Sequence, residues 1–108
     1  MVKYKIGKMT LGRRIRELRE LSGMLQRQLA AILEIGDGYL SKVENDQKLI
    51  KREHLNTISK TFNCSISELE ALWIATRVYD IIKDEKEALN ALKVAEEQVK
   101  YKNAIKND

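Results

Sequence analysis

The sequence predicts an all-α fold, with one small helical domain and an additional helix after it. Three observations support this. The 108-residue chain contains no proline, it is rich in Leu, Ala, Lys and Glu, and its apolar residues recur three or four positions apart. Apolar residues make up 44% of the chain, which favours a folded protein over a disordered one.

The first helix is expected over residues 11–21. Thr10 can cap its N-terminus, and Gly23 suits the left-handed position just after its C-terminus. Its predicted apolar stripe consists of Leu11, Ile15, Leu18 and Leu21.

Two short helices follow, over residues 26–33 and 37–44, joined by a turn at 34–36. The apolar faces expected to hold them together comprise Leu29, Ile32 and Leu33 on the first helix, and Leu40 and Val43 on the second. Two short helices joined by a tight turn form a helix-turn-helix, whose second helix enters the DNA major groove. We therefore call residues 37–44 the predicted recognition helix.

A fourth helix is expected over residues 52–62 and a long fifth helix from 66 to about 82, after a capping box of Ser65 and Glu68. Asp84 and Glu87 repeat that pattern, so a sixth helix is expected to begin at Glu85. Its apolar row, Ala88, Leu92, Ala95 and Val99, resembles a narrow heptad seam. We expect a domain over 10–72 and a helical extension over 73–104; residues 1–9 suit a short strand or a basic arm equally well.

The charge is unevenly distributed along the chain. Residues 1–62 carry 13 Lys/Arg against 7 Asp/Glu, whereas residues 63–108 carry 7 against 9. A basic first half is typical of a nucleic-acid-binding part. One cysteine, one histidine and no phosphate-binding loop argue against a metal site, a cofactor or an enzyme. With no signal peptide or apolar membrane span, a cytoplasmic location is expected.

Many residue types recur at fixed spacings between Leu11 and Leu69: Gly23, Met24, Gln26, Leu29, Ala30, Leu33, Ile35, Leu40, Ser41, Val43, Glu44, Asn45, Leu55, Ile58, Ser65, Glu68 and Leu69. In these residues the stretch resembles the Cro/cI-type, or XRE, family of helix-turn-helix regulators. The resemblance implies a five-helix, λ-repressor-like fold and sequence-specific binding to double-stranded DNA. Less specifically, the C-terminal part resembles XRE regulators that accompany restriction–modification genes.

The resemblance also implies a set of DNA contacts. Arg19 and Glu44 match positions that form an ion pair, which would orient the guanidinium towards a phosphate. The expected base contacts are Asp37, Gly38, Tyr39, Ser41 and Lys42. The expected phosphate contacts are Arg19, Gln26, Arg27, Asn45, Lys48, Lys51 and Arg52.

Four positions depart from the family pattern. Leu25 and Gly36 stand where capping hydroxyls are usual, and Glu34 and Asp46 replace common glycines. A lost cap costs on the order of 1 kcal/mol, and a positive φ at Glu34 would add strain. These departures affect the helix starts, and with them the set of base contacts.

A single short helix reads few bases, so we expect a homodimer on a two-fold operator, with repression or autoregulation as its outcome. The expected dimer contacts are Leu72, Trp73, Leu89, Leu92 and Val99. The alternative for the sixth helix is that it folds back to cover its own domain. An alternative function is that of an antitoxin-like DNA-binding protein whose C-terminal helices bind a partner protein. No small-molecule effector is evident.

Overall fold

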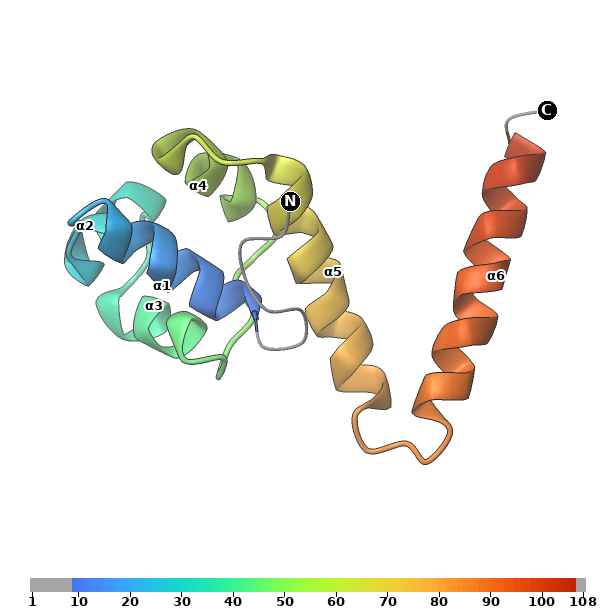
Figure 1. Ribbon diagram of the computed structural model, residues 1–108. Coiled ribbons are helices and arrows are strands. Elements are labelled where there is room, and N and C mark those ends of the chain that lie inside the picture. Colours follow the sequence, from blue (N-terminus) through green and yellow to red (C-terminus); the bar gives the residue numbers. More distant parts are fainter. Residues whose placement is uncertain (1–8, 107–108) are drawn as a thin grey trace. The chain divides into compact units, whose positions relative to one another are not determined.

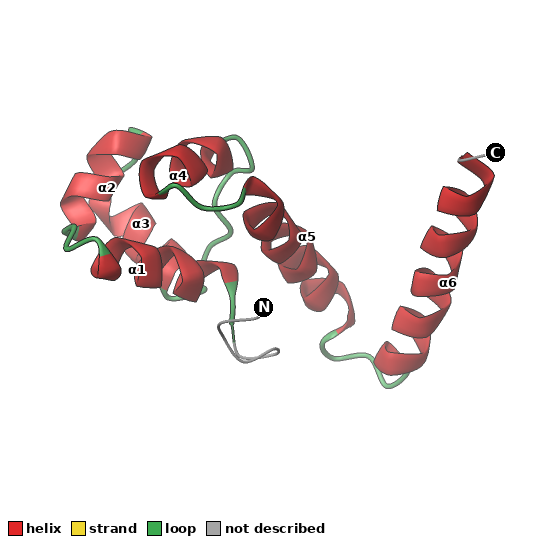
Figure 2. Ribbon diagram, turned by 45° about the horizontal axis from the view of Figure 1, so that its top comes forward, coloured by secondary structure: helices red, strands yellow, loops and turns green. Residues whose placement is uncertain are grey.

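The computed structural model describes residues 9–106, and within them it contains six α-helices and no β-strand (Figures 1 and 2). The predicted all-α fold, with a long fifth helix and an extra sixth, is confirmed. Nearly all of the expected N-terminal strand or arm, residues 1–9, lies outside the described residues. The helices are α1 (Leu11–Leu21), α2 (Gln26–Leu33), α3 (Asp37–Glu44), α4 (His54–Phe62), α5 (Ile66–Ile82) and α6 (Ala88–Lys106).

The chain divides into two compact units, the first ending at Arg77 and the second starting at Val78, so the boundary falls inside α5. We call them unit 1 and unit 2. Unit 1 holds α1 to α4 and most of α5, which pack around one another in Figure 1. Unit 2 holds the end of α5 and the whole of α6.

Local signals set most helix boundaries in unit 1. The Thr10 hydroxyl accepts a hydrogen bond from the Arg13 backbone N–H at 3.1 Å, as its N-cap position predicts. Gly23 and Asn63 adopt the left-handed conformation just after α1 and α4, with φ of 68° and 51°. These residues end their helices where the sequence predicts.

The capping box expected at the start of α5 forms only in part. The Ser65 hydroxyl accepts from the Glu68 backbone N–H at 3.3 Å. The Glu68 carboxylate does not reach back to Ser65, because it accepts a hydrogen bond from Arg14 Nε at 2.6 Å instead. A tertiary ion pair between α1 and α5 has replaced half of a local motif.

Two helices begin later than predicted. Residues 51–53 form a turn closed by the His54 and Leu55 N–H groups, which donate to the carbonyls of Lys51 and Arg52. Residues 82–87 form turns closed in the same three-residue pattern, and the Glu87 carboxylate accepts from the Asn90 side chain at 2.7 Å. Helix α4 therefore begins at 54 rather than 52, and α6 at 88 rather than 85.

The hydrophobic core lies in unit 1 and draws on all five of its helices. Leu21 and Ile32, which were expected on apolar faces, are 79% and 43% exposed. Leu21 is the last residue of α1, and Ile32 stays outside the core although the next residue, Leu33, is buried in it. Ile50, in the loop before α4, is buried although no helical pattern marked it. The buried apolar residues are Leu11, Ile15, Leu18, Leu29, Ala30, Leu33, Leu40, Val43, Ile50, Leu55, Ile58 and Leu69.

Candidate nucleic-acid interface

Helices α2 and α3 form the expected helix-turn-helix. Ala30 is fully buried, and its small side chain lets the two helices approach closely. The turn begins at Glu34, which has a φ of 58°, and the Ile35 N–H donates to the Ala30 carbonyl at 3.0 Å. Because this φ is positive and the residue is not glycine, the turn holds backbone strain at Glu34.

The N-terminus of α2 lacks the usual capping hydroxyl but is not left without a cap. Leu25 occupies the cap position, and its backbone N–H donates to the side-chain oxygen of Gln28 at 2.7 Å. This is the reaching-back half of a capping box. It satisfies the N–H of Leu25 itself, while the Gln28 N–H, from which a capping hydroxyl could accept, donates to the Leu25 carbonyl at 3.0 Å.

A buried ion pair fixes the C-terminal end of α3 to α1. Arg19 Nε and Nη2 donate to the two carboxylate oxygens of Glu44 at 2.7 and 2.9 Å, a bidentate geometry. The Glu44 side chain is 2% exposed and that of Arg19 11%. The predicted pair is confirmed. The hydrogen bond with Glu44 raises the pKa of Arg19, although burial opposes that rise.

Gln26 and Met24 extend this pair into a network. Gln26, the first residue of α2, donates from Nε2 to the same Glu44 carboxylate at 3.1 Å. Arg19 Nη1 donates to the Met24 carbonyl at 3.0 Å. Three helices are thus joined at one carboxylate, and the orientation of the Gln26 amide is set before any phosphate binds.

The residues predicted to read bases differ in exposure. Asp37, Gly38 and Lys42 are exposed, and a Cβ built on Gly38 would meet no atom within 4 Å. Ser41 is half-buried. Tyr39 is half-buried against the core, and its hydroxyl donates to the Leu49 carbonyl at 3.3 Å, so its donor is already engaged.

The loop after α3 carries the predicted phosphate contacts. Asn45 caps α3 by donating from its side chain to the Ser41 carbonyl at 2.9 Å, and it remains exposed. Lys48 and Lys51 are exposed, and Arg52 lies 3.5 Å from Glu70. The remaining predicted phosphate contact, Arg27, is exposed on α2.

Gly12 is a positioning residue that the sequence analysis missed. A Cβ on Gly12 would lie 2.2 Å from the Val43 carbonyl oxygen and 2.6 Å from Oδ1 of Asp46, so the residue must lack a side chain for α1 to touch the end of α3. Asp46 has a φ of 63° and accepts from the Thr10 hydroxyl at 2.9 Å. An isolated glycine inside a helical pattern was the available signal.

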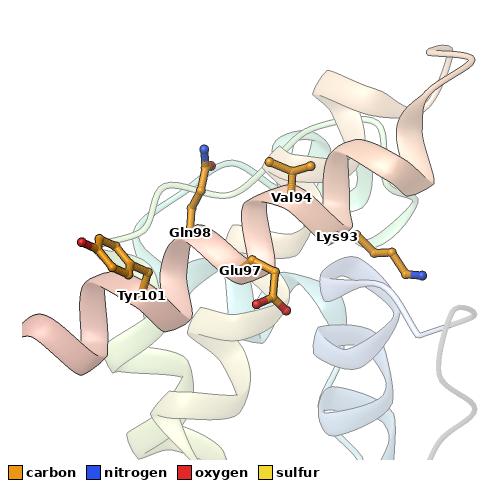
Figure 3. Close-up of a pocket in the computed structure, with 5 residues that line it drawn as sticks. All are labelled: Lys93, Val94, Glu97, Gln98 and Tyr101. Atoms are coloured by element: carbon orange, nitrogen blue, oxygen red, sulfur yellow. The ribbon is translucent and has the colours of Figure 1, made fainter.

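The predicted dimer contacts fall into two groups. Leu72 and Trp73 are half-buried against the core of unit 1. Leu89, Leu92 and Val99 lie on α6, a helix with no buried residue. A shallow hollow of about 460 Å³ lies on α6. Its lining residues all come from that one helix and are drawn in Figure 3: Lys93, Val94, Glu97, Gln98 and Tyr101.

Other chemistry has little support in the described residues. Among residues 9–106 no group of three or more His, Cys, Asp or Glu side chains could hold a metal ion. Cys64 is a free, half-buried thiol, and burial raises its pKa. No helix in the same range is both long enough and apolar enough to cross a membrane.

Comparison with known proteins shows what the chain is similar to. The helix-turn-helix family model HTH_3 matches residues 15–69, about half of the chain. The competence pilus inhibition repressor of Acinetobacter baylyi is 34% identical over 61 residues, which cover 56% of this chain and 56% of that protein. The chain therefore spans about half the length of the curated relative that it matches.

Proposed function

The chain belongs to the helix-turn-helix family, and from this premise we propose that it represses transcription by binding a two-fold DNA operator as a homodimer. Family membership, with a repressor as a relative, makes it a DNA-binding regulator of transcription and not an enzyme. The observation that carries the proposal is the buried Arg19–Glu44–Gln26 network. It holds α3 rigidly while Asp37, Gly38 and Lys42 face solvent.

In this proposal α3 lies in the major groove. Lys42 donates to guanine N7 or O6, Ser41 pairs with a base edge, and Asp37 accepts from a cytosine amino group. Gly38 allows the helix to approach the bases closely, because no atom fills the space beside it. Tyr39 would contact a thymine methyl through its ring, since its hydroxyl is bonded to Leu49.

The phosphate contacts surround this helix. Gln26 and Arg27 supply donors at the N-terminus of α2, where backbone N–H groups already favour an anion. Arg19 approaches the backbone next to Gln26, and the loop after α3 supplies Asn45, Lys48, Lys51 and Arg52. Such contacts set the position of the protein on DNA but read no sequence.

The exposed state of α6 supports the homodimer. This helix has 19 residues and none is buried. In proteins most of the stability of a helix comes from packing of its apolar face, and Leu89, Leu92 and Val99 are exposed on α6. A second copy would cover this face and also supply a second recognition helix one DNA turn away, roughly 34 Å. A link to restriction–modification genes stays a prediction.

Selection from a random-sequence duplex library tests operator binding. We expect an enriched two-fold motif with half-sites centred about 10–10.5 bp apart. Lys42→Ala should lower affinity for that motif by about 1–3 kcal/mol more than for random DNA, whereas Lys60→Ala, an exposed change on α4, should not discriminate. Enrichment of a single half-site would exclude the dimeric operator, and absence of binding at low salt would exclude DNA binding itself.

Sedimentation equilibrium tests the dimer on the intact chain and on a chain ending at Asp84. We expect the intact protein to dimerise and the shortened one to remain monomeric. Equal dimerisation of the two would remove α6 from the interface. A monomeric intact chain would instead leave the α6 face for a partner protein.

A further inference from the structure

Two arginine side chains lie close to the ring of Trp73, on α5. The guanidinium carbons of Arg52 and Arg77 lie 5.2 and 5.3 Å from the centroid of the Trp73 ring. The indole Nε1–H donates to the Ile50 carbonyl at 2.7 Å, which ties the ring to the backbone just before Lys51 and Arg52. Because a cation near a tryptophan face is attracted to it, the ring limits where both guanidinium groups can go.

The two arginines differ in how their charge is compensated. Arg52 has the Glu70 carboxylate at 3.5 Å. Arg77 is exposed, and among the described residues no carboxylate lies within 4 Å of its guanidinium group. The cluster of Arg52, Glu70, Trp73 and Arg77 therefore carries one excess positive charge. A guanidinium restrained by a ring and lacking an acidic partner is well suited to a phosphate, whose oxygens its planar donor fork matches.

We propose that Arg77 contacts the phosphate backbone of duplex DNA and that Trp73 positions Arg77 and Arg52 for that contact. The inference rests on the proposed DNA binding and extends its phosphate surface from the loop after α3 onto α5. The new contact would be continuous with the predicted ones, because the Trp73 ring beside Arg77 is hydrogen-bonded to Ile50. Ile50 directly precedes Lys51 and Arg52, two of the predicted phosphate contacts. All residues involved lie in unit 1.

The salt dependence of binding to a short random-sequence duplex tests this contact without knowledge of the operator. The logarithm of the binding constant falls as the logarithm of the salt concentration rises, and Arg77→Ala should make this slope shallower by about 0.9 for each protomer bound. At about 0.1 M salt the same change should weaken the DNA binding of each protomer roughly eightfold. Arg77→Lys should keep most of the slope, because the positive charge remains. Trp73→Phe keeps a ring but removes the donor to Ile50, so we expect a smaller slope although no charge is lost.

Arg16→Ala is the matched control, since Arg16 is an exposed arginine of unit 1 outside the proposed contacts and pairs with Glu20 at 3.2 Å. An equal slope change in Arg16→Ala and Arg77→Ala would overturn the proposal by showing a general charge effect. An unchanged slope in Arg77→Ala, with duplex binding retained, would also overturn it and leave DNA binding intact. Failure of the wild-type chain to bind duplex at low salt would instead reject the proposed function. If Trp73→Phe lowers the melting temperature, Arg77→Ala and Arg77→Lys still test the phosphate contact, because the Arg77 side chain is exposed.

Discussion

Units 1 and 2 differ in how far their apolar side chains are buried. In unit 1 the side chains of Ile15, Leu29 and Leu40 are fully buried, and the core is closed within one chain. In unit 2 no residue of α6 is buried, and Leu89 and Tyr101 are 79% and 70% exposed. Burial of apolar surface is the main favourable term in folding. Unit 1 therefore buries an apolar core of its own, whereas the apolar side chains of α6 remain exposed.

Their ion pairs differ in the same direction. The Arg19–Glu44 pair of unit 1 is bidentate and nearly excluded from solvent. In unit 2 Lys100 lies 3.8 Å from Glu96 and from Glu97, with all three side chains more than 60% exposed. Exposed pairs contribute about 0–1 kcal/mol, whereas removal of one partner from a buried pair strands a charge. The Arg19–Glu44 pair therefore fixes the geometry of unit 1, whereas the pairs on α6 contribute little, as do exposed pairs of unit 1 such as Arg16–Glu20.

The largest expected effect is that of Arg19→Ala. This change leaves the Glu44 carboxylate buried with only the Gln26 amide as a donor, so unfolding free energy should fall by about 3–5 kcal/mol. Urea denaturation measures it. The double variant Arg19→Ala/Glu44→Ala should lose less than the sum of the two single changes. A loss below about 1 kcal/mol for Arg19→Ala would mean that the pair behaves like an exposed one.

A pair of leucines compares the two units directly. Leu40→Ala empties a fully buried site in unit 1 and should cost about 2–5 kcal/mol. Leu89→Ala, on α6, should change the unfolding free energy by less than about 0.5 kcal/mol in dilute protein, where any dimer dissociates. A large loss in Leu89→Ala under those conditions would show that α6 is covered by its own chain.

Two helical glycines provide a smaller test within unit 1. Gly12→Ala places a Cβ against the Val43 carbonyl and Asp46, and overpacking of this kind costs about 1–3 kcal/mol. Gly38→Ala meets open space, so the better helix propensity of Ala should stabilise the fold by up to about 1 kcal/mol. Thermal melting of both variants shows whether each change raises or lowers the stability of the fold. Stabilisation by Gly12→Ala would contradict the direct contact of α1 with α3.

The helices of unit 1 were predictable because their signals are local. Apolar spacing identifies the buried residues of α1 to α4, and Thr10, Gly23 and Asn63 mark helix ends through their own capping chemistry. The resemblance to the XRE family, built on such positions, is confirmed by the family match. The expectation that Leu21 and Ile32 are buried was wrong, because helical spacing alone does not show which apolar positions pack against another helix.

The rest of the interface depends on contacts between distant residues. No spacing rule shows that Gly12 touches Val43, that Glu68 prefers Arg14 to its own cap, or that Trp73 bonds to Ile50. Each of these requires knowledge of how helices approach one another. The Arg19–Glu44 pair was predicted only because the resemblance supplied it. The base, phosphate and dimer contacts stay predictions.

The smallest effect on stability is expected where the effect on assembly is largest. Leu92→Asp places a charge in the apolar row of α6, and a buried unpaired carboxylate in an interface is costly. We expect the melting of unit 1 to stay unchanged while sedimentation shows a monomer. Asn90→Asp, two residues away and pointing elsewhere around the helix, adds the same charge and should leave the dimer intact. If both variants dimerise, the Leu92 row is not the interface; if both dissociate, net charge rather than apolar contact controls assembly. If only Leu92→Asp abolishes the dimer, the exposed apolar face of α6 is the dimer interface that the proposed two-fold operator requires.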